Sequence, residues 1–179
     1  GTLLVVDECF GDFLDQPEDH TMVPRLEEHL LILKAFTKFY AMAGLRLGYC
    51  LCGSRALLAA MAQAGQPWPV STPAQAAGVA ALEETGYARR LRELILEQRP
   101  WLAEQLMALG CCVVPGEANY LLFSCPVPEL ETKLRRRGIL IRNCANYMGL
   151  CPGWYRIAVR TGPENQRLVT AFSEVIHNG

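Results

Sequence analysis

The chain contains 179 residues, and its 17 basic and 18 acidic side chains give a formal net charge of -1. A hydrophobic content of 51% with 20% charged residues is typical of a globular protein and excludes a disordered tail or a collagenous chain. Neither sign of charge forms a long block, so nothing favours a nucleic acid or a membrane surface as a partner. No apolar stretch approaches the roughly 18 residues of a membrane-spanning helix, and no secretion signal is visible. We therefore expect a cytoplasmic protein.

The sequence contains eight cysteines, a number that raises the question of a disulfide framework or a metal site. No two of them form a C-x-x-C pair, the spacing that zinc sites and redox centres commonly use. Several stand in apolar surroundings, where a thiol packs as a small hydrophobic group. We therefore expect no metal site. The cysteines in apolar surroundings are Cys50, Cys52, Cys111 and Cys112.

The first part of the chain alternates apolar runs with polar connections. Residues 3–6 form a continuous apolar run of the kind that fills a buried parallel sheet. Residues 30–33 and 49–52 are further apolar runs, so we expect three strands of one α/β sheet. Ser54 is a natural N-cap for a helix that ends at Gly65.

A helical region is expected between residue 74 and about residue 109, where Ala, Leu, Glu, Arg and Gln dominate. The preceding residues 66–73 contain three prolines and cannot be helical. Gly86 and Pro100 should interrupt the helical region. We expect two or three helical segments that link two bodies.

After Gly110 the pattern changes to short strands and helices, which is typical of a small α+β domain. Thr161 and Glu164 resemble a capping box, and an apolar helical face follows them, so a helix should close the chain. The expected strands are residues 111–114, 120–123, 139–142 and 155–159, and the expected short helix is residues 129–137.

These patterns together predict an α/β protein with two domains. Residues 1–85 should be the C-terminal part of a larger domain with a mainly parallel sheet. Residues 86–179 should hold the linking helices and a small α+β C-terminal domain. The strands of this second domain should form a sheet of their own.

Three charged residues of the first part could carry chemistry. Asp7 ends the first apolar run, Lys38 follows Thr37, and Arg46 stands eight residues further along. Each alone has an ordinary explanation, as a helix cap, a lysine lying along the surface or a surface ion pair. Their combination resembles the fold-type I pyridoxal-phosphate enzymes, whose cofactor needs an amine, a carboxylate at the ring nitrogen and a cation at the phosphate.

That resemblance implies a role for each residue. Lys38 would form the Schiff base with pyridoxal 5'-phosphate and be the catalytic residue, and Asp7 would meet the ring nitrogen. Arg46 and the Thr37 hydroxyl would bind the cofactor phosphate. The chemistry agrees with these roles, because a carboxylate keeps the pyridinium protonated and an arginine fork matches a phosphate.

Longer motifs narrow the resemblance. Residues 36–49 are FTKFYAMAGLRLGY, and residues 118–122 are ANYLL. Residues 139–147 are ILIRNCANY, and residues 155–160 are YRIAVR. In combination, these motifs resemble the threonine-phosphate decarboxylases of cobalamin biosynthesis, which are related to the histidinol-phosphate aminotransferases.

The same resemblance implies three substrate-binding residues in the second half. Arg142 would meet the substrate phosphate, Arg156 the α-carboxylate, and Asn119 would lie beside that carboxylate or the cofactor. Both arginines stand on expected strands, where an unpaired cation is costly, so a bound anion is a sensible partner. The alternative is that each arginine pairs with a protein carboxylate. Arg160 would support the site without binding the ligand.

Two residues depart from the family pattern. Phe10 stands where aminotransferases of the wider class carry a tyrosine whose hydroxyl reaches the cofactor ring oxygen, so that hydrogen bond is absent. Ala35 replaces a serine or threonine that would donate to the phosphate, which lowers the expected cofactor affinity. Phe10 and residues 144–147 favour the decarboxylase over the aminotransferase.

The implied reaction of the intact enzyme is decarboxylation of L-threonine O-3-phosphate to (R)-1-aminopropan-2-yl phosphate. Its small-molecule partner would be a phosphorylated amino acid, and the intact enzyme would be a homodimer. Enzymes of this kind have roughly twice this length, and their first half supplies a helix N-terminus for the cofactor phosphate. We therefore expect the chain to be a C-terminal portion that alone holds no cofactor and is inactive.

Two alternatives remain at the level of the sequence. One is a pyridoxal-phosphate-dependent aminotransferase of the histidinol-phosphate type, which would use the same residues to remove the Cα proton. The other is an inactive folded fragment that acts only as an interaction module.

Overall fold

A computed structural model describes residues 1–177 of the chain. The chain separates into two compact units, Gly1–Arg90 and Leu91–Gly179. The boundary between them falls inside helix α4 (Thr85–Ala108).

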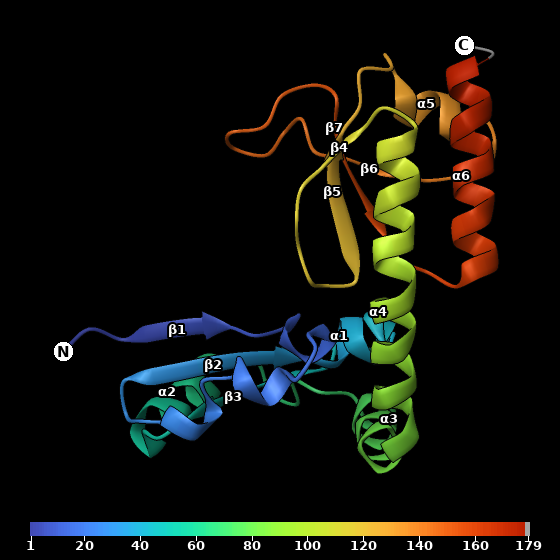
Figure 1. Ribbon diagram of the computed structural model, residues 1–179. Helices are drawn as coiled ribbons and strands as arrows, with labels where there is room; N and C mark the ends of the chain where they lie inside the picture. The colour runs from blue at the N-terminus through green and yellow to red at the C-terminus, as the bar shows by residue number, and fades with distance from the viewer. Residues whose placement is uncertain (178–179) are drawn as a thin grey trace. The chain divides into compact units, whose positions relative to one another are not determined.

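The first unit contains a three-stranded sheet in the order β1-β2-β3. Its strands are β1 (Leu4–Asp7), β2 (Leu30–Ala35) and β3 (Gly48–Cys52), which confirms the three expected strands to within two residues at each end. Figure 1 shows β1 and β2 side by side, and they pair in parallel, whereas β3 pairs antiparallel with β2.

The sheet of this unit is therefore mixed, which corrects the expectation of a mainly parallel sheet. The connection from β2 to β3 holds only the four-residue helix α1 (Phe36–Phe39) and the short turn η4 (Ala43–Leu45). A parallel return needs a crossover, usually a full helix, to carry the chain back along the sheet. Without one, β3 begins beside the end of β2, where Gly48 is paired with Ala35.

Between β1 and β2 the chain makes three 3₁₀ turns, η1 (Gly11–Phe13), η2 (Pro17–Asp19) and η3 (Val23–Arg25). Phe13 of η1 is buried and meets Phe39 edge to face, with ring centroids 5.1 Å apart. This contact packs the first turn against α1. Other buried apolar side chains of the unit are Leu30, Leu31, Ile32, Phe36, Cys52 and Ala74.

Two helices follow the sheet of the first unit. Helix α2 (Arg55–Ala64) begins at the expected cap, where the Ser54 hydroxyl accepts a hydrogen bond from the Leu57 N–H at 3.2 Å. Helix α3 (Thr72–Glu83) starts two residues before the expected position, because the Ser71 hydroxyl caps it at the Ala74 N–H.

Helix α4 continues through both residues that were expected to interrupt the helical region. The break lies instead at Glu84, whose ψ of 74° is not helical. Pro100 stands inside α4, and Ile95, Leu102 and Leu106 are buried on either side of it. We attribute the continuity to this burial, which offsets the hydrogen bond that proline removes.

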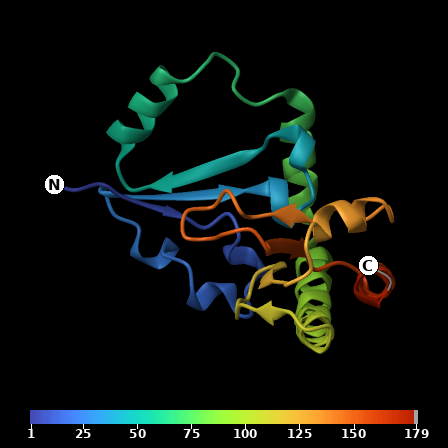
Figure 2. The same cartoon turned by 90° about the horizontal axis from the view of Figure 1, so that it is seen from above.

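The second unit contains its own sheet, as expected. This sheet has four strands in the order β4-β5-β7-β6. Its strands are β4 (Cys112–Val113), β5 (Tyr120–Ser124), β6 (Arg142–Asn143) and β7 (Trp154–Ala158), and all neighbours are antiparallel. The helices α5 (Leu130–Arg135) and α6 (Gly162–His177) complete the unit, and Figures 1 and 2 show α4, α5 and α6 on one side of this sheet.

One face of this sheet carries the core. Leu121, Phe123, Tyr155 and Ile157 alternate along β5 and β7 and are buried with side chains from the three helices. The residues between them, among which is Arg156, therefore point to the opposite face. The helix residues in the core are Leu102, Leu106, Leu130, Leu134, Leu168 and Phe172.

Strand β6 begins later than the sequence predicts. Residues 139–141 do not pair as a strand, and the backbone of the first of them is used by the end of α5. Gly138 has a φ of 75°, and the Ile139 N–H donates to the Leu134 carbonyl at 3.1 Å, which closes the helix. Strand pairing starts only at Arg142.

Candidate functional site

Asp7 lies at the end of β1 as an exposed carboxylate. Its Oδ1 atom accepts a hydrogen bond from the Cys9 N–H at 2.9 Å. Hydrogen bonds from the Cys9 thiol and then from the Cys9 N–H lower the pKa of the Asp7 carboxyl. The strand therefore ends in a carboxylate that is held in its ionised form.

Lys38 and Thr37 lie on α1, which begins directly where β2 ends. The Lys38 side chain is exposed, and no carboxylate pairs with it in the described part of the chain. Thr37 is half-buried. The amine is thus presented on the surface of the unit, where a ligand could reach it.

Arg46 is also exposed and lies two residues before β3. Its backbone has a φ of 55°, in the left-handed region that non-glycine residues rarely occupy. Its Nη1 atom donates to the Ala43 carbonyl at 3.0 Å. Such backbone strain is concentrated at functional positions, which makes Arg46 a candidate for binding.

The strand register brings these residues to one edge of the sheet. Asp7 is paired with Leu33 near the end of β2, and Ala35 at that end is paired with Gly48 at the start of β3. Lys38 follows β2, and Arg46 precedes β3. The carboxylate, the amine and the guanidinium predicted for the cofactor therefore belong to the same sheet edge, the carboxyl end of the parallel pair, where α/β sheets bind ligands.

In the second unit, Arg142 of β6 and Arg156 of β7 are directly opposite each other. Opposite residues of an antiparallel pair share one face, with Cα atoms about 5 Å apart, and two like charges in that position repel each other. Within residues 1–177, no carboxylate forms an ion pair with either guanidinium. This finding counts against the alternative in which each arginine pairs with a protein carboxylate.

Each arginine instead lies over an aromatic ring. The Arg156 guanidinium carbon is 5.1 Å from the centroid of Tyr120, and that of Arg142 is 5.7 Å from the centroid of Tyr147. The Nη2 atom of Arg142 also donates to Oδ1 of Asn146 at 3.3 Å. Stacking on a ring orients a guanidinium and leaves its N–H groups available for an anion.

Asn119 stands just before β5, and its backbone carbonyl accepts a hydrogen bond from the Val159 N–H at 2.8 Å. Its side-chain Oδ1 is buried and accepts no hydrogen bond from the described residues. A buried acceptor without a donor is costly, and a ligand that donates a hydrogen bond would satisfy it.

Arg160 differs from the other two arginines because it is already paired. Its Nη2 and Nε atoms lie 2.6 and 2.8 Å from Oε1 of Glu164. Glu164 also accepts from the Thr161 hydroxyl at 2.7 Å and from the Thr161 N–H at 3.3 Å. These contacts form the expected cap at the start of α6 and already give the Arg160 guanidinium a carboxylate partner.

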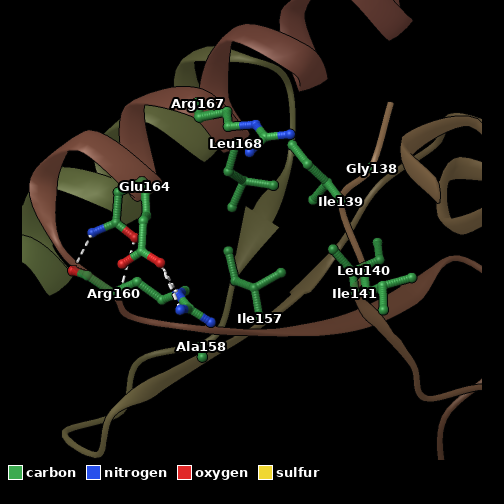
Figure 3. A pocket seen from close by; sticks show the side chains of 11 residues that line it. Gly138, Ile139, Leu140, Ile141, Ile157, Ala158, Arg160, Glu164, Arg167 and Leu168 are labelled. Carbon is green, nitrogen blue, oxygen red and sulfur yellow. Dashed lines mark hydrogen bonds and ion pairs between the residues drawn. The ribbon is translucent and has the colours of Figure 1, made fainter. Parts of the chain in front are cut away.

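A cavity of about 400 Å³ lies beside this cap. Figure 3 shows Ile157, Leu168 and Ile141 along it and the ion pair between Arg160 and Glu164 at one side. None of the predicted substrate residues lines the cavity. The open face with Arg142 and Arg156 is therefore a different surface.

The structure also adds residues that the sequence analysis did not single out. The rings of Tyr120 and Tyr147 under the arginines belong to this group, and so does Lys34 of β2. Lys34 could have been identified from the sequence, because a charged residue inside an otherwise apolar strand needs a partner.

Among the described residues, no group of three or more His, Cys, Asp or Glu side chains could hold a metal ion. No helix in the same part of the chain is long and apolar enough to cross a membrane.

The chain is similar to known proteins along almost its whole length. The family model for aminotransferase class I and II matches residues 1–172. The chain is 37% identical over 178 residues to a threonine-phosphate decarboxylase of Salmonella typhimurium, a match that covers 97% of this chain and 48% of the relative. It is also 37% identical over 180 residues to a histidinol-phosphate aminotransferase of Symbiobacterium thermophilum, with 99% and 49% covered.

A solved structure agrees with these relatives. The histidinol-phosphate aminotransferase from Clostridium acetobutylicum is 27% identical, with a TM-score of 0.92 over 99% of this chain and 55% of that chain. The chain thus spans about half the length of the curated relatives it matches. Because the family model covers nearly all of the sequence and the fold agrees, the chain belongs to the aminotransferase class I and II family.

Proposed function

We propose that a full-length protein containing this chain is a pyridoxal-phosphate-dependent decarboxylase of L-threonine O-3-phosphate, as in cobalamin biosynthesis. Its product would be (R)-1-aminopropan-2-yl phosphate, released with CO2. The observation that carries the proposal is the opposed pair Arg142 and Arg156, which has no carboxylate partner among residues 1–177. A substrate with a phosphate and a carboxylate supplies one anion for each guanidinium.

The residues of the first unit fit pyridoxal phosphate by the chemistry of their side chains. The ionised carboxylate of Asp7 suits a protonated ring nitrogen, and the exposed amine of Lys38 suits an aldehyde. Arg46 and the Thr37 hydroxyl suit a phosphate. When bound, the cofactor supplies an electron sink for the bond that breaks.

Each residue then has a defined task in the proposed reaction. Asp7 holds a proton at the ring nitrogen, and Arg46 with Thr37 holds the phosphate end. Arg142 and Arg156 bind the two anionic groups of the substrate and so orient the bond to the carboxylate. The Lys38 amine returns a proton to the substrate carbon after CO2 has left.

The Asn119 side chain supports the same assignment. Its buried Oδ1 needs a hydrogen-bond donor, and a substrate with an amine has one to offer. Asn119 is adjacent in sequence to Tyr120, whose ring lies against Arg156. We assign Asn119 to the substrate together with the two arginines.

The second candidate function is an aminotransferase of the histidinol-phosphate type. It is favoured by a specific observation, the 37% identity to the Symbiobacterium thermophilum enzyme, which equals the identity to the decarboxylase. Both reactions would use the same cofactor residues. They differ in whether CO2 is released and whether a keto acid is required.

The experiment that decides between them uses the full-length protein with L-threonine O-3-phosphate. Release of CO2 without added keto acid is the expected result, and turnover that needs a keto acid and releases no CO2 would favour the aminotransferase.

Arg142→Ala should reduce turnover of the phosphorylated substrate far more than that of threonine, whereas Arg156→Ala should reduce both. Removal of a charged hydrogen-bond partner costs about 2–5 kcal/mol, or about 30-fold or more in affinity. Equal losses for both substrates in both variants would contradict the assignment.

A further inference from the structure

Lys34 lies inside β2, yet its ammonium group is almost fully enclosed. Its side chain is 11% exposed, and its Nζ atom lies 2.8 Å from Oδ1 of Asp12 and 3.6 Å from Oε2 of Glu8. Tyr49 is directly opposite it on β3. Burial acts to lower the pKa of the Lys34 amine, but the hydrogen bond and charge of Asp12 outweigh it, so the pKa is raised. Lys34 is therefore held as a cation between two carboxylates.

Glu8 joins the two ends of the segment that follows β1. It is only 7% exposed and follows Asp7 directly. Its Oε2 accepts from the Thr21 hydroxyl at 2.7 Å, and its Oε1 accepts from the Met22 N–H at 2.7 Å. The turns between residues 8 and 22 are thus closed by one buried carboxylate, which forms an ion pair with Lys34.

Backbone hydrogen bonds also hold the turn that directly follows Asp7. The Glu8 N–H donates to the Leu33 carbonyl at 2.9 Å, and the Gly11 N–H donates to the Glu8 carbonyl at 3.0 Å. The Cys9 N–H between them donates to Asp7. Asp12, which holds the Lys34 amine, belongs to the next turn. The conformation of residues 8–12 is therefore fixed by contacts on both sides of Cys9.

We propose that Lys34 is a positioning residue which, through Glu8 and Asp12, holds the turn that presents the Asp7 carboxylate at the sheet edge. The inference rests on the proposed role of Asp7 toward the cofactor. In this assignment Lys34 contacts no ligand, because its amine is already paired with Glu8 and Asp12. Both of these carboxylates belong to the turn. Its removal would leave Glu8 and Asp12 as two carboxylates with no shared cation, and the turn would open.

Cys9 provides a local readout of this turn without any cofactor. Burial first, and then the hydrogen bond to Asp7, raise the pKa of its thiol to about 11 from an ordinary value of 9.0. The charge of Lys34 lowers this pKa and the charge of Asp12 raises it, so loss of the Lys34 charge alone would slow the labelling of Cys9, and faster labelling in Lys34→Met reports an opened turn. Only the thiolate reacts with alkylating reagents, so the closed turn makes Cys9 slow to react.

The experiment measures alkylation of each cysteine by iodoacetamide, resolved by peptide mass spectrometry, in the purified chain between pH 7 and 10. In Lys34→Met, the Cys9 rate at pH 8 should rise about tenfold or more, and its pH midpoint should fall toward 9. Cys52, buried on β3 of the same unit, should keep its slow rate. Lys34→Arg should restore slow labelling of Cys9, and Lys133→Met, the same change in the other unit, should leave it unchanged.

The proposal is overturned if Cys9 labelling in Lys34→Met matches that of the parent chain while Cys52 stays protected. It is also overturned if Lys34→Arg fails to restore protection. Should Lys34→Met unfold, Cys52 will label as well, and Glu8→Gln then replaces it, because the charge of Asp12 itself raises the Cys9 pKa and its loss would speed labelling even in a closed turn. Glu8→Gln should raise the Cys9 rate by a smaller factor with Cys52 protected, and no change in Cys9 there would contradict the proposal. A responsive Cys9 in the chain, together with a full-length protein that shows no decarboxylase activity, would contradict the proposed function alone.

Discussion

Two lysines four residues apart in the first unit have opposite environments. Lys34 is enclosed by Asp12 and Glu8, whereas Lys38 is exposed on α1. The motif around Lys38 distinguished it in the sequence, because a lysine between Thr37 and aromatic residues matches a family pattern. Lys34 could not be interpreted in the same way, since its partners come from turns whose path depends on the tertiary fold.

The arginines of the second unit also have partners that the sequence alone did not predict. The sequence placed Arg142 and Arg156 on strands and left open whether protein carboxylates pair with them. The answer depends on the register, which sets the two residues opposite each other, and on the rings of Tyr120 and Tyr147 beneath them. Neither contact follows from spacing along the chain.

Lys38→Ala gives the residue-scale prediction. In the full-length protein supplied with pyridoxal phosphate, the variant should lose the borohydride-reducible adduct, because the amine that forms it is gone. Its stability should change by no more than about 0.5 kcal/mol, since Lys38 is exposed and makes no ion pair with a described carboxylate. Lys133→Ala is the matched control and should keep the adduct. A reducible adduct that persisted in Lys38→Ala would show that another amine is used.

At the scale of elements, local signals predicted most helices and strands, and tertiary contacts moved their ends. The cap at Ser54 and the strands β1, β2 and β5 follow directly from side-chain chemistry and apolar runs. Pro100 did not end α4, because buried side chains hold the helix together on both sides. Residues 139–141 carry a strand-like apolar run, but its first residue, Ile139, is used to close α5. Propensity is a weak guide where packing or a cap competes for the same backbone.

The cap of α6 gives the element-scale prediction. Hydrogen bonds from Arg160 first, and then from Thr161, lower the pKa of Glu164 to about 2 from an ordinary value of 4.5. The folded chain therefore binds this proton only at lower pH than the unfolded chain does. The stabilisation from Glu164 is complete above pH 4.5 and is lost as the pH falls to about 2.

Urea unfolding of the chain at several pH values tests this cap. Glu164→Gln should unfold at lower urea than the parent chain above pH 4.5, and the two curves should converge as the pH approaches 2. Glu174→Gln, a change at a different ion pair of the same helix, is the control for a general loss of acidic charge. A difference between Glu164→Gln and the parent chain that stayed constant from pH 6 to pH 2 would contradict the assigned pKa.

At the scale of the whole molecule, the candidate residues divide between the two compact units. Asp7, Lys38 and Arg46 belong to the first unit, and Arg142 and Arg156 to the second. The chain spans about half the length of its curated relatives, and within residues 1–177 β1 pairs with β2 alone. Neighbouring residues of a strand point to opposite faces of the sheet. Leu4 and Val5 of β1 therefore lie on different faces, and they are 51% and 50% exposed. Both faces of β1 are thus open to water beside Asp7.

This exposure predicts that the chain by itself does not retain pyridoxal phosphate. Asp7, Lys38 and Arg46 are all exposed. In water, two unit charges 4 Å apart attract by only about 1 kcal/mol, and an exposed Schiff base hydrolyses readily. After incubation with excess cofactor and gel filtration, the chain should show no stoichiometric visible absorbance. Lys38→Ala should behave in the same way as the parent chain, because the adduct is not held in either. Stoichiometric cofactor that survived gel filtration in the parent chain and was absent from Lys38→Ala would show that these residues suffice without further protein contacts.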